Sequence, residues 1–181
     1  GVPPVDEEEY LGPVYPTRTA SLSTSATLAR RITLSALGEF QGGHYLTSGV
    51  ARQQVRRDLW PTCIGLSERI EAGDIAGITA RDQARCSYTN SYLDWTERAD
   101  FFKLRQVSLS YRLPETWLPD NVRALTVRLE ALNILTITDF PGIDPEAIED
   151  GSLEGNAAFY RVEYYNIPPP RRFQVRINVD F

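Results

Sequence analysis

The clearest structural signal in the chain is residues 173–181, which read Phe-Gln-Val-Arg-Ile-Asn-Val-Asp-Phe. Apolar side chains occupy every second position from Phe173 to Phe181, and polar side chains fill the positions between them. Successive side chains of a β-strand point to opposite faces of a sheet, so this alternation is typical of a strand with one apolar and one polar face. The pattern predicts a strand over 171–181.

The same period of two returns in four other segments. Leu125, Val127 and Leu129 alternate with Thr126 and Arg128. Alternation of this kind is typical of half-buried strands rather than of helices, whose apolar residues recur three or four positions apart. The sequence therefore predicts an all-β chain with five strands, at 18–28, 31–41, 101–113, 123–135 and 171–181.

The connections between the predicted strands alternate between short and long. The link at 29–30 is tight, and the link over 114–121 is rich in turn-forming Pro, Asp and Asn. The links 43–99 and 136–170 far exceed the usual loop of about 4–6 residues. A soluble sandwich would bury the apolar faces against a second sheet, whereas an outer-membrane barrel has short turns at one end and long loops at the other. The loop asymmetry favours the barrel.

The composition fits a folded protein and excludes several functional classes. The chain has 181 residues, with 19 basic and 24 acidic side chains and a net charge of −5, so nucleic acid is not an expected partner. No apolar run approaches the length of about 20 residues that a membrane-spanning helix requires. The chain has no Met and opens on Gly1 without an apolar signal core, so we expect it to be a piece of a longer protein.

Motifs of known catalytic chemistry are missing from the sequence. It contains no Gly-x-Ser-x-Gly elbow, no phosphate-binding glycine-rich loop and no His-Glu-x-x-His motif. His44 is the only histidine, so a Ser-His-Asp triad would have to use it. Asp144 and Glu146 could be a glycosidase pair, but two carboxylates so close in sequence are common, and their geometry decides such a role. The acidic run 6–9 would suit calcium but is better explained as a solvated loop. We therefore predict no enzymatic activity, no metal site and no cofactor.

Three segments after residue 100 carry a more specific pattern. They are Asp-Phe-Phe-Lys-Leu-Arg-Gln-Val-Ser-Leu-Ser-Tyr at 100–111, Leu-Glu-Ala-Leu-Asn-Ile-Leu-Thr at 129–136 followed by Gly-Ile-Asp-Pro-Glu at 142–146, and the segment 167–181, which opens on Ile-Pro-Pro-Pro-Arg-Arg-Phe. In this order and spacing they resemble the last strands of SusC/RagA-type TonB-dependent outer-membrane receptors. Less specific features at 11–16 and 42–43 extend the resemblance, while the segment with the cysteines departs from the family pattern.

The resemblance implies a fold and a function. The five antiparallel strands would be the C-terminal segment of a 22-stranded transmembrane β-barrel, with the loops 43–99 and 136–170 on the extracellular side. The parent would import an oligosaccharide or a peptide with a SusD-like lipoprotein. A TonB complex would act through N-terminal regions outside this chain. The alternative is a soluble all-β carbohydrate-binding module.

Aromatic side chains in the predicted external loops are candidates for contacts with a glycan or peptide substrate or with the lipoprotein. Aromatic rings can stack on sugar rings, although local packing is the commoner role of such residues. The candidates are Trp60, Tyr92, Trp95 and Tyr160.

The closing strand resembles a further signal of outer-membrane proteins. An aromatic last residue with apolar residues at every second position before it resembles the signal that the barrel-assembly machinery recognises. An extended strand offers unpaired backbone groups that can add to a sheet edge, and its alternate side chains supply selectivity. The other interpretation is a strand that merely ends the chain. The predicted signal residues are Phe173, Val175, Ile177, Val179 and Phe181. In the assembled barrel their side chains would face lipid.

The two cysteines, Cys63 and Cys86, lie in the predicted external loop 43–99. They are too far apart for a Cys-x-x-Cys redox pair, and one histidine is too few to complete a zinc site. Since disulfides persist outside the reducing cytosol, we predict a Cys63–Cys86 disulfide, the alternative being two buried thiols. Short helical turns are predicted at 66–71 and 79–82, with Ser67 or Thr79 as a cap.

Overall fold

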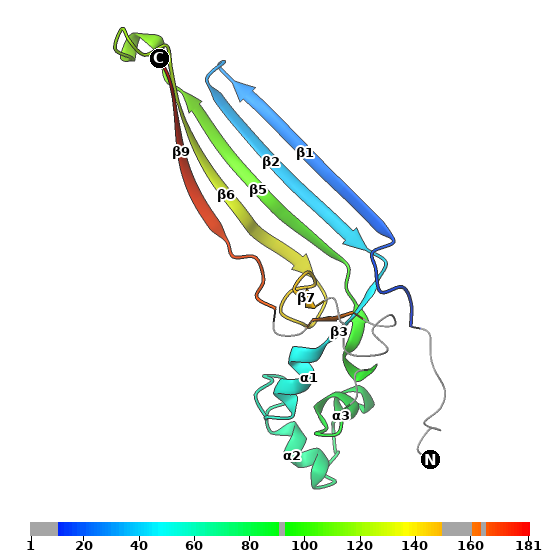
Figure 1. Cartoon of the computed structure of the whole chain (residues 1–181). Helices are drawn as coiled ribbons and strands as arrows, with labels where there is room; N and C mark the ends of the chain where they lie inside the picture. The colour runs from blue at the N-terminus through cyan, green and yellow to red at the C-terminus, as the bar shows by residue number, and fades with distance from the viewer. Residues whose placement is uncertain (1–10, 91–92, 150–160, 164–165) are drawn as a thin grey trace. The chain divides into compact units, whose positions relative to one another are not determined.

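The computed structural model describes residues 11–90, 93–149, 161–163 and 166–181. The chain divides into two compact units. Figure 1 shows the chain coloured by residue number. The sheet unit consists of residues 18–42, 100–139 and 167–181. The loop unit consists of the described residues of 1–17, 43–99 and 140–166.

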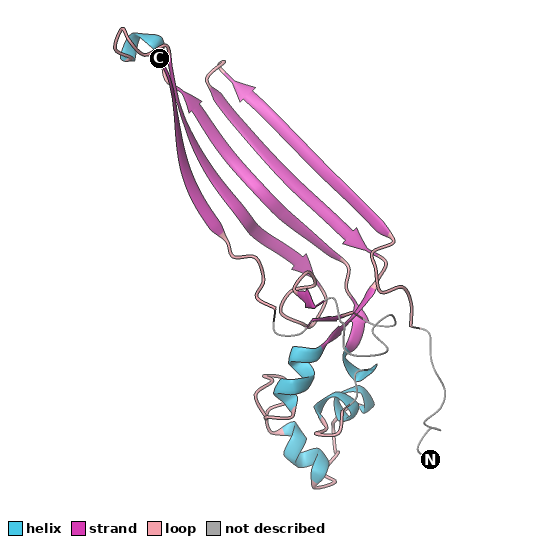
Figure 2. Cartoon of the chain, viewed as in Figure 1, coloured by secondary structure: helices cyan, strands magenta, loops and turns pink. Residues whose placement is uncertain are grey.

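The sheet unit is a single antiparallel sheet of five strands (Figure 2). Each of the five strands predicted from the alternation is present, with ends that differ from the prediction by at most three residues. The spatial order follows the chain order, so each strand pairs with the preceding one in the sheet. The strands are β1 (Arg18–Leu28), β2 (Ile32–Gly42), β5 (Phe101–Arg112), β6 (Ala124–Thr138) and β9 (Arg172–Asp180).

Both short connections are compact turns at one end of this sheet. Between β1 and β2, Ala29 and Arg30 have positive φ angles of 49° and 58°, and the Arg31 N–H donates to the Leu28 carbonyl at 3.1 Å. Two positive φ angles match the right-handed twist of the flanking strands. Between β5 and β6 the chain forms the short 3₁₀ helix η2 (Glu115–Trp117). The two long connections therefore leave the strands at the other end.

Irregularities in register accentuate the curvature of the sheet. The β2–β5 pairing shifts between Leu37 and Gly38, and the β5–β6 pairing shifts between Leu104 and Gln106. Such bulges bend a strand and increase its twist. A Cβ at Gly38 would lie 2.7 Å from the ring of Phe102, so the glycine allows the ring to cover the backbone beside the bulge.

The loop unit has a small sheet of four short strands that the sequence pattern does not predict. Its strands are too short for alternation to be visible in the sequence, and β3 pairs with β8 in parallel from a distant part of the chain. The order in the sheet is β4-β3-β8-β7. The strands are β3 (Tyr45–Ser48), β4 (Thr96–Arg98), β7 (Ile148–Glu149) and β8 (Val162–Glu163).

Short helices fill the rest of the segment 43–99. They are α1 (Gly49–Val55), α2 (Leu66–Glu71), α3 (Ala80–Cys86) and the 3₁₀ helix η1 (Leu93–Trp95). Thr79 caps α3 by accepting a hydrogen bond from the Asp82 N–H, as its sequence position predicted. Ser67 does not cap α2: the helix begins after Gly65, whose φ is 74°, and Ser67 is buried inside it. A cap at Gly65 relies on backbone freedom rather than on a side chain, which is why the polar residue was misleading.

Buried apolar clusters occur in the loop unit. One consists of Ala51, Val55, Cys63, Cys86 and Trp95, and the other of Leu46, Ala99 and Phe140. Among the described residues, the sheet unit contributes no member to either cluster. The loop unit therefore has a core of its own, while the sheet does not bury its apolar face in one.

In the part of the chain that the structure describes, no helix combines the length and the apolar character needed to cross a membrane.

Candidate functional site

The register of the sheet unit collects the apolar side chains on one face. Ala26, Leu34, Leu109, Leu129 and Val175 form one continuous row across all five strands. The next row along the strands is equally apolar. It consists of Leu28, Ile32, Tyr111, Val127 and Ile177.

These apolar rows are open to the surroundings. Leu129 is 49% exposed, Val175 is 67% exposed and Ile177 is 61% exposed. Water-soluble proteins rarely leave an apolar surface of several strands uncovered, because its hydration is unfavourable. The face therefore suits an apolar environment such as lipid.

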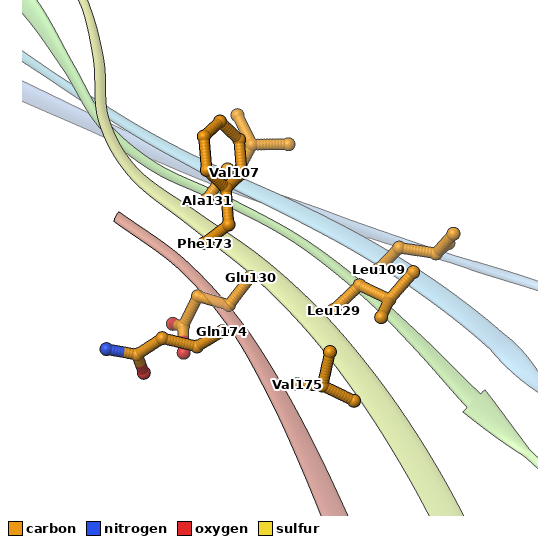
Figure 3. Close-up of a pocket in the computed structure, with 8 residues that line it drawn as sticks. All are labelled: Val107, Leu109, Leu129, Glu130, Ala131, Phe173, Gln174 and Val175. Carbon is orange, nitrogen blue, oxygen red and sulfur yellow. The ribbon is translucent and has the colours of Figure 1, made fainter. Parts of the chain in front are cut away.

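The apolar face carries a hollow of about 370 Å³ over β5, β6 and β9. It forms where the small side chain of Ala131 lies between Val107 and Phe173 (Figure 3). The figure also shows Glu130 and Gln174 pointing away from Phe173, to the other face. The two faces therefore differ in chemistry residue by residue.

The opposite face is a network of polar side chains. Ser35 and Ser108 share a hydrogen bond of 2.6 Å, and Arg128 donates to the Ser108 Oγ at 3.1 Å. At the loop end of the same face, Arg105 Nε donates to Glu39 Oε2 at 2.9 Å. Side chains satisfied in this way are compatible with an aqueous boundary.

Four of the predicted assembly residues lie on β9, at one edge of the sheet, and Phe181 follows the last residue of that strand. All of them are exposed, and β9 pairs with β6 alone among the described strands. An edge strand with a free row of backbone groups can receive another strand. The structure thus places these residues where strand addition is feasible, and their role as a signal stays a prediction.

The structure joins Cys63 to Cys86 in a disulfide with a Cα–Cα distance of 5.1 Å. The bond connects the turn before α2 to the last residue of α3, across 23 positions of sequence. Both cysteines belong to the first buried cluster of the loop unit. The pairing agrees with the prediction, and we infer that it stabilises the helical part of this unit.

Two of the four candidate aromatics, Trp60 and Trp95, lie within the described residues. Trp95 is 2% exposed and packs edge-to-face on Trp60, with ring centroids 5.6 Å apart. The Arg85 guanidinium lies 5.1 Å from the centre of the Trp95 ring. This burial contradicts a ligand-stacking role for Trp95 and favours local packing. Tyr92, Tyr160 and the acidic run 6–9 lie outside the described residues.

The residues considered for catalysis, His44, Asp144 and Glu146, all lie in the loop unit. His44 is buried in the loop unit next to β3, and Asp144 Oδ1 accepts a hydrogen bond from the Glu146 N–H at 2.8 Å. This bond closes a local turn of the kind that Asp commonly stabilises. In the described ranges, no group of three or more His, Cys, Asp or Glu side chains is arranged to hold a metal ion.

A buried carboxylate that the sequence did not single out connects three segments of the loop unit. Glu163 of β8 is 1% exposed. Its carboxylate accepts hydrogen bonds from the Ser48 hydroxyl at 2.8 Å and from the Ile143 N–H at 3.1 Å. A Cβ at Gly142 would lie 2.8 Å from Glu163 Oε2, so the glycine permits this close approach. Burial raises the pKa of Glu163, the two hydrogen bonds oppose the rise, and Asp144 adds to it.

The raised pKa predicts a pH dependence of the loop unit. Because the folded pKa of Glu163 exceeds the unfolded value, its contribution to stability is complete below the unfolded pKa and is lost as pH rises through the folded pKa. Glu163→Gln should therefore flatten the pH dependence and leave the unit more stable at neutral pH than the wild type. Amide hydrogen exchange of β3 and β8 measures the stability of the unit at each pH, once the pH dependence of the exchange chemistry itself is subtracted. An unchanged pH profile in the variant would contradict it.

Comparison with known proteins bears on both units. No family model matches the chain. A curated protein, TonB-dependent receptor P3 of Formosa agariphila, is 31% identical over 84 residues, which is 45% of this chain and 8% of the receptor. The matched segment therefore spans less than a tenth of that relative.

Solved structures give a wider match in fold. The RagAB peptide importer in its open-open state covers 93% of this chain with a TM-score of 0.62 and 19% identity, and the match involves 17% of that chain. The RagAB peptide transporter covers 90% with a TM-score of 0.57 and also 19% identity. These likenesses agree with the exposed apolar rows and the all-β sheet. The predicted resemblance is confirmed: the chain is similar in sequence to part of a TonB-dependent receptor and has the fold of part of such a barrel protein.

Proposed function

We propose that the chain is the C-terminal wall of an outer-membrane, TonB-dependent nutrient importer. This proposal is supported above all by the difference between the two faces of the sheet. One face has exposed apolar rows, and the other has a hydrogen-bonded network of polar side chains. Strands of a membrane barrel present one face to lipid and the other to an aqueous interior. In this proposal the five strands belong to a 22-stranded barrel in the outer membrane, and the loop unit lies on the extracellular side.

The proposed cargo is a peptide or an oligosaccharide. The RagAB structures that this chain resembles are described as a peptide importer and a peptide transporter, which supports a peptide first. We propose a SusD-like lipoprotein that contacts the loop unit and shares ligand capture. A TonB complex would supply energy through regions of the parent protein outside this chain.

A soluble carbohydrate-binding module is the competing function. Such a module would bury the apolar face of the sheet against a second sheet. The described residues instead leave that face exposed, and the small second sheet belongs to a different compact unit. The exposed rows favour the importer.

Growth on defined nutrients tests the proposed function. Deletion of the gene that encodes this chain should abolish growth on a peptide mixture or an oligosaccharide as the limiting nutrient. Growth on free amino acids or monosaccharides is the control and should be unchanged, because such small solutes do not require an active outer-membrane importer. Normal growth of the deletion strain on every peptide and oligosaccharide source would contradict the proposal.

We further propose that the apolar row of β9 serves recognition by the barrel-assembly machinery. The change Phe181→Ser removes the aromatic side chain beside the last strand and should reduce the amount of heat-modifiable, folded protein in outer membranes several-fold. Asn178→Ser, on the polar face of the same strand, is the matched control and should assemble normally. The measurement is the folded fraction on semi-native gels, and equal assembly of the two variants would remove the proposed role.

A further inference from the structure

Two arginines lie directly opposite each other on neighbouring strands of the sheet unit. Arg128 of β6 is in register with Arg176 of β9, so both side chains lie on the polar face. Directly opposite residues have Cβ atoms about 4.5–5.5 Å apart, and like charges in such a position destabilise the strand pair. An anion bound between the two guanidinium groups would attract both of them and so replace their mutual repulsion by a net attraction.

Neighbouring side chains neutralise this pair incompletely. A terminal nitrogen of Arg128 donates to Ser108 Oγ at 3.1 Å and lies 3.6 Å from Glu130 Oε1. The same Glu130 oxygen accepts a hydrogen bond from Gln106. Within the described ranges, Arg128 Nε is buried without a hydrogen-bond partner and Arg176 forms no ion pair. Donor capacity therefore remains on both arginines.

The surroundings of the pair add positive charge. Arg112 of β5 pairs with Thr126 and so lies diagonally from Arg128 on the same face. Its ion pair with Glu115 is 4.0 Å long and exposed, and such pairs contribute little. The polar face is therefore basic although the chain has a net charge of −5. Its basic residues are Lys103, Arg105, Arg112, Arg128, Arg172 and Arg176, and its acidic residues are Glu39, Glu130 and Asp180.

We propose that Arg128 and Arg176 form a binding site for a carboxylate on the polar face of the sheet. Guanidinium groups match the two oxygens of a carboxylate, and hydrogen bonds between charged partners are roughly twice as strong as neutral ones. The carboxylate has two sources of the same chemistry. It belongs either to an acidic cargo or to an Asp or Glu side chain from another part of the intact protein.

This inference rests on the proposed function, because the polar face must border an aqueous passage for a cargo to reach it. The experiment uses the intact, detergent-solubilised protein with a peptide of four glutamates as the probe and a peptide of four lysines as the control ligand. The test variant is Arg176→Gln. The matched control is Arg172→Gln, on the same strand and face but opposite Leu132 rather than an arginine.

If the cargo supplies the carboxylate, the wild type and Arg172→Gln bind the acidic peptide, and Arg176→Gln binds it at least about tenfold more weakly, the loss expected for one charge-assisted pair. If the protein supplies it, the peptide has no effect, and Arg176→Gln lowers the melting temperature while Arg172→Gln does not. Both results support the site. Either of two results would overturn the site. In the first, Arg176→Gln leaves binding unchanged and raises the melting temperature, because the repulsion between the arginines is relieved. In the second, Arg176→Gln behaves like Arg172→Gln. Failure of the importer proposal is seen separately, as normal growth of the deletion strain.

Discussion

Leu129→Arg should destabilise the folded protein in a lipid bilayer by about 2–4 kcal/mol, the cost of an arginine near the midplane of a barrel wall. Leu129 lies in a row of apolar side chains next to the middle of the sheet and is 49% exposed. If the exposed face meets lipid, the guanidinium has no water and no polar partner there. Urea unfolding of the intact protein in phospholipid vesicles measures the change.

Gln174→Arg is the matched control for this substitution. Gln174 lies on the neighbouring strand, with its side chain on the polar face directly opposite Glu130. An arginine there gains an acidic neighbour and remains hydrated, so the free energy of unfolding should change by less than about 1 kcal/mol. Equal costs for the two variants would contradict the assignment of the faces.

Loss of the Cys63–Cys86 disulfide should also have a large effect on stability. Replacing Cys63 and Cys86 together by serine should lower the stability of the loop unit by about 3 kcal/mol, because the bond constrains a loop closed over 23 positions of sequence. The loss should be local, since the cysteines belong to the loop unit and the five long strands to the other unit. Hydrogen exchange should therefore accelerate in α3 and remain unchanged in β5 and β6.

Reductant supplies the control for the disulfide variant. Dithiothreitol should accelerate exchange of α3 in the wild type to the rate seen in the double-serine protein, and it should leave that protein unchanged. A wild type whose α3 exchanges at the same rate with and without reductant would show that helix packing, rather than the bond, holds this region.

The sheet was predictable because its physical signal is local and repeated. Each long strand has enough residues for alternation to be visible, as in 173–181, and the turn at Ala29 and Arg30 is too short for anything but a hairpin. The register followed with little freedom, because a shift by one residue would exchange the apolar and polar faces of a strand. The bulges at Leu37 and Leu104 were not visible, since they displace single residues within an otherwise regular pattern.

The loop unit was predictable only in part. The cysteine pairing followed from compartment and loop placement, and the cap at Thr79 followed from local chemistry. The parallel pairing of β3 with β8 and the buried carboxylate of Glu163 depend on contacts between residues more than a hundred positions apart. Nothing in a short window of sequence marks such contacts. Burial of Trp95 had the same origin, because its neighbours come from several short elements.

The candidate arginine site could likewise be predicted only in part from the sequence. Alternation alone places Arg128 and Arg176 on polar faces of their strands, but only the β6–β9 register places them opposite each other. The sequence therefore indicated which face is polar, and the pairing indicated where its charges concentrate.

Spin labelling along β9 shows which face of the sheet meets lipid. The two cysteines of this chain are bonded to each other, so a single cysteine introduced at each position from Phe173 to Val179 carries the label. In lipid bilayers, accessibility to oxygen should peak at 173, 175, 177 and 179, and accessibility to a water-soluble nickel chelate should be higher at 174, 176 and 178. Labels at the apolar positions that are immobile and shielded from both reagents would show a face buried in protein, and would contradict the account.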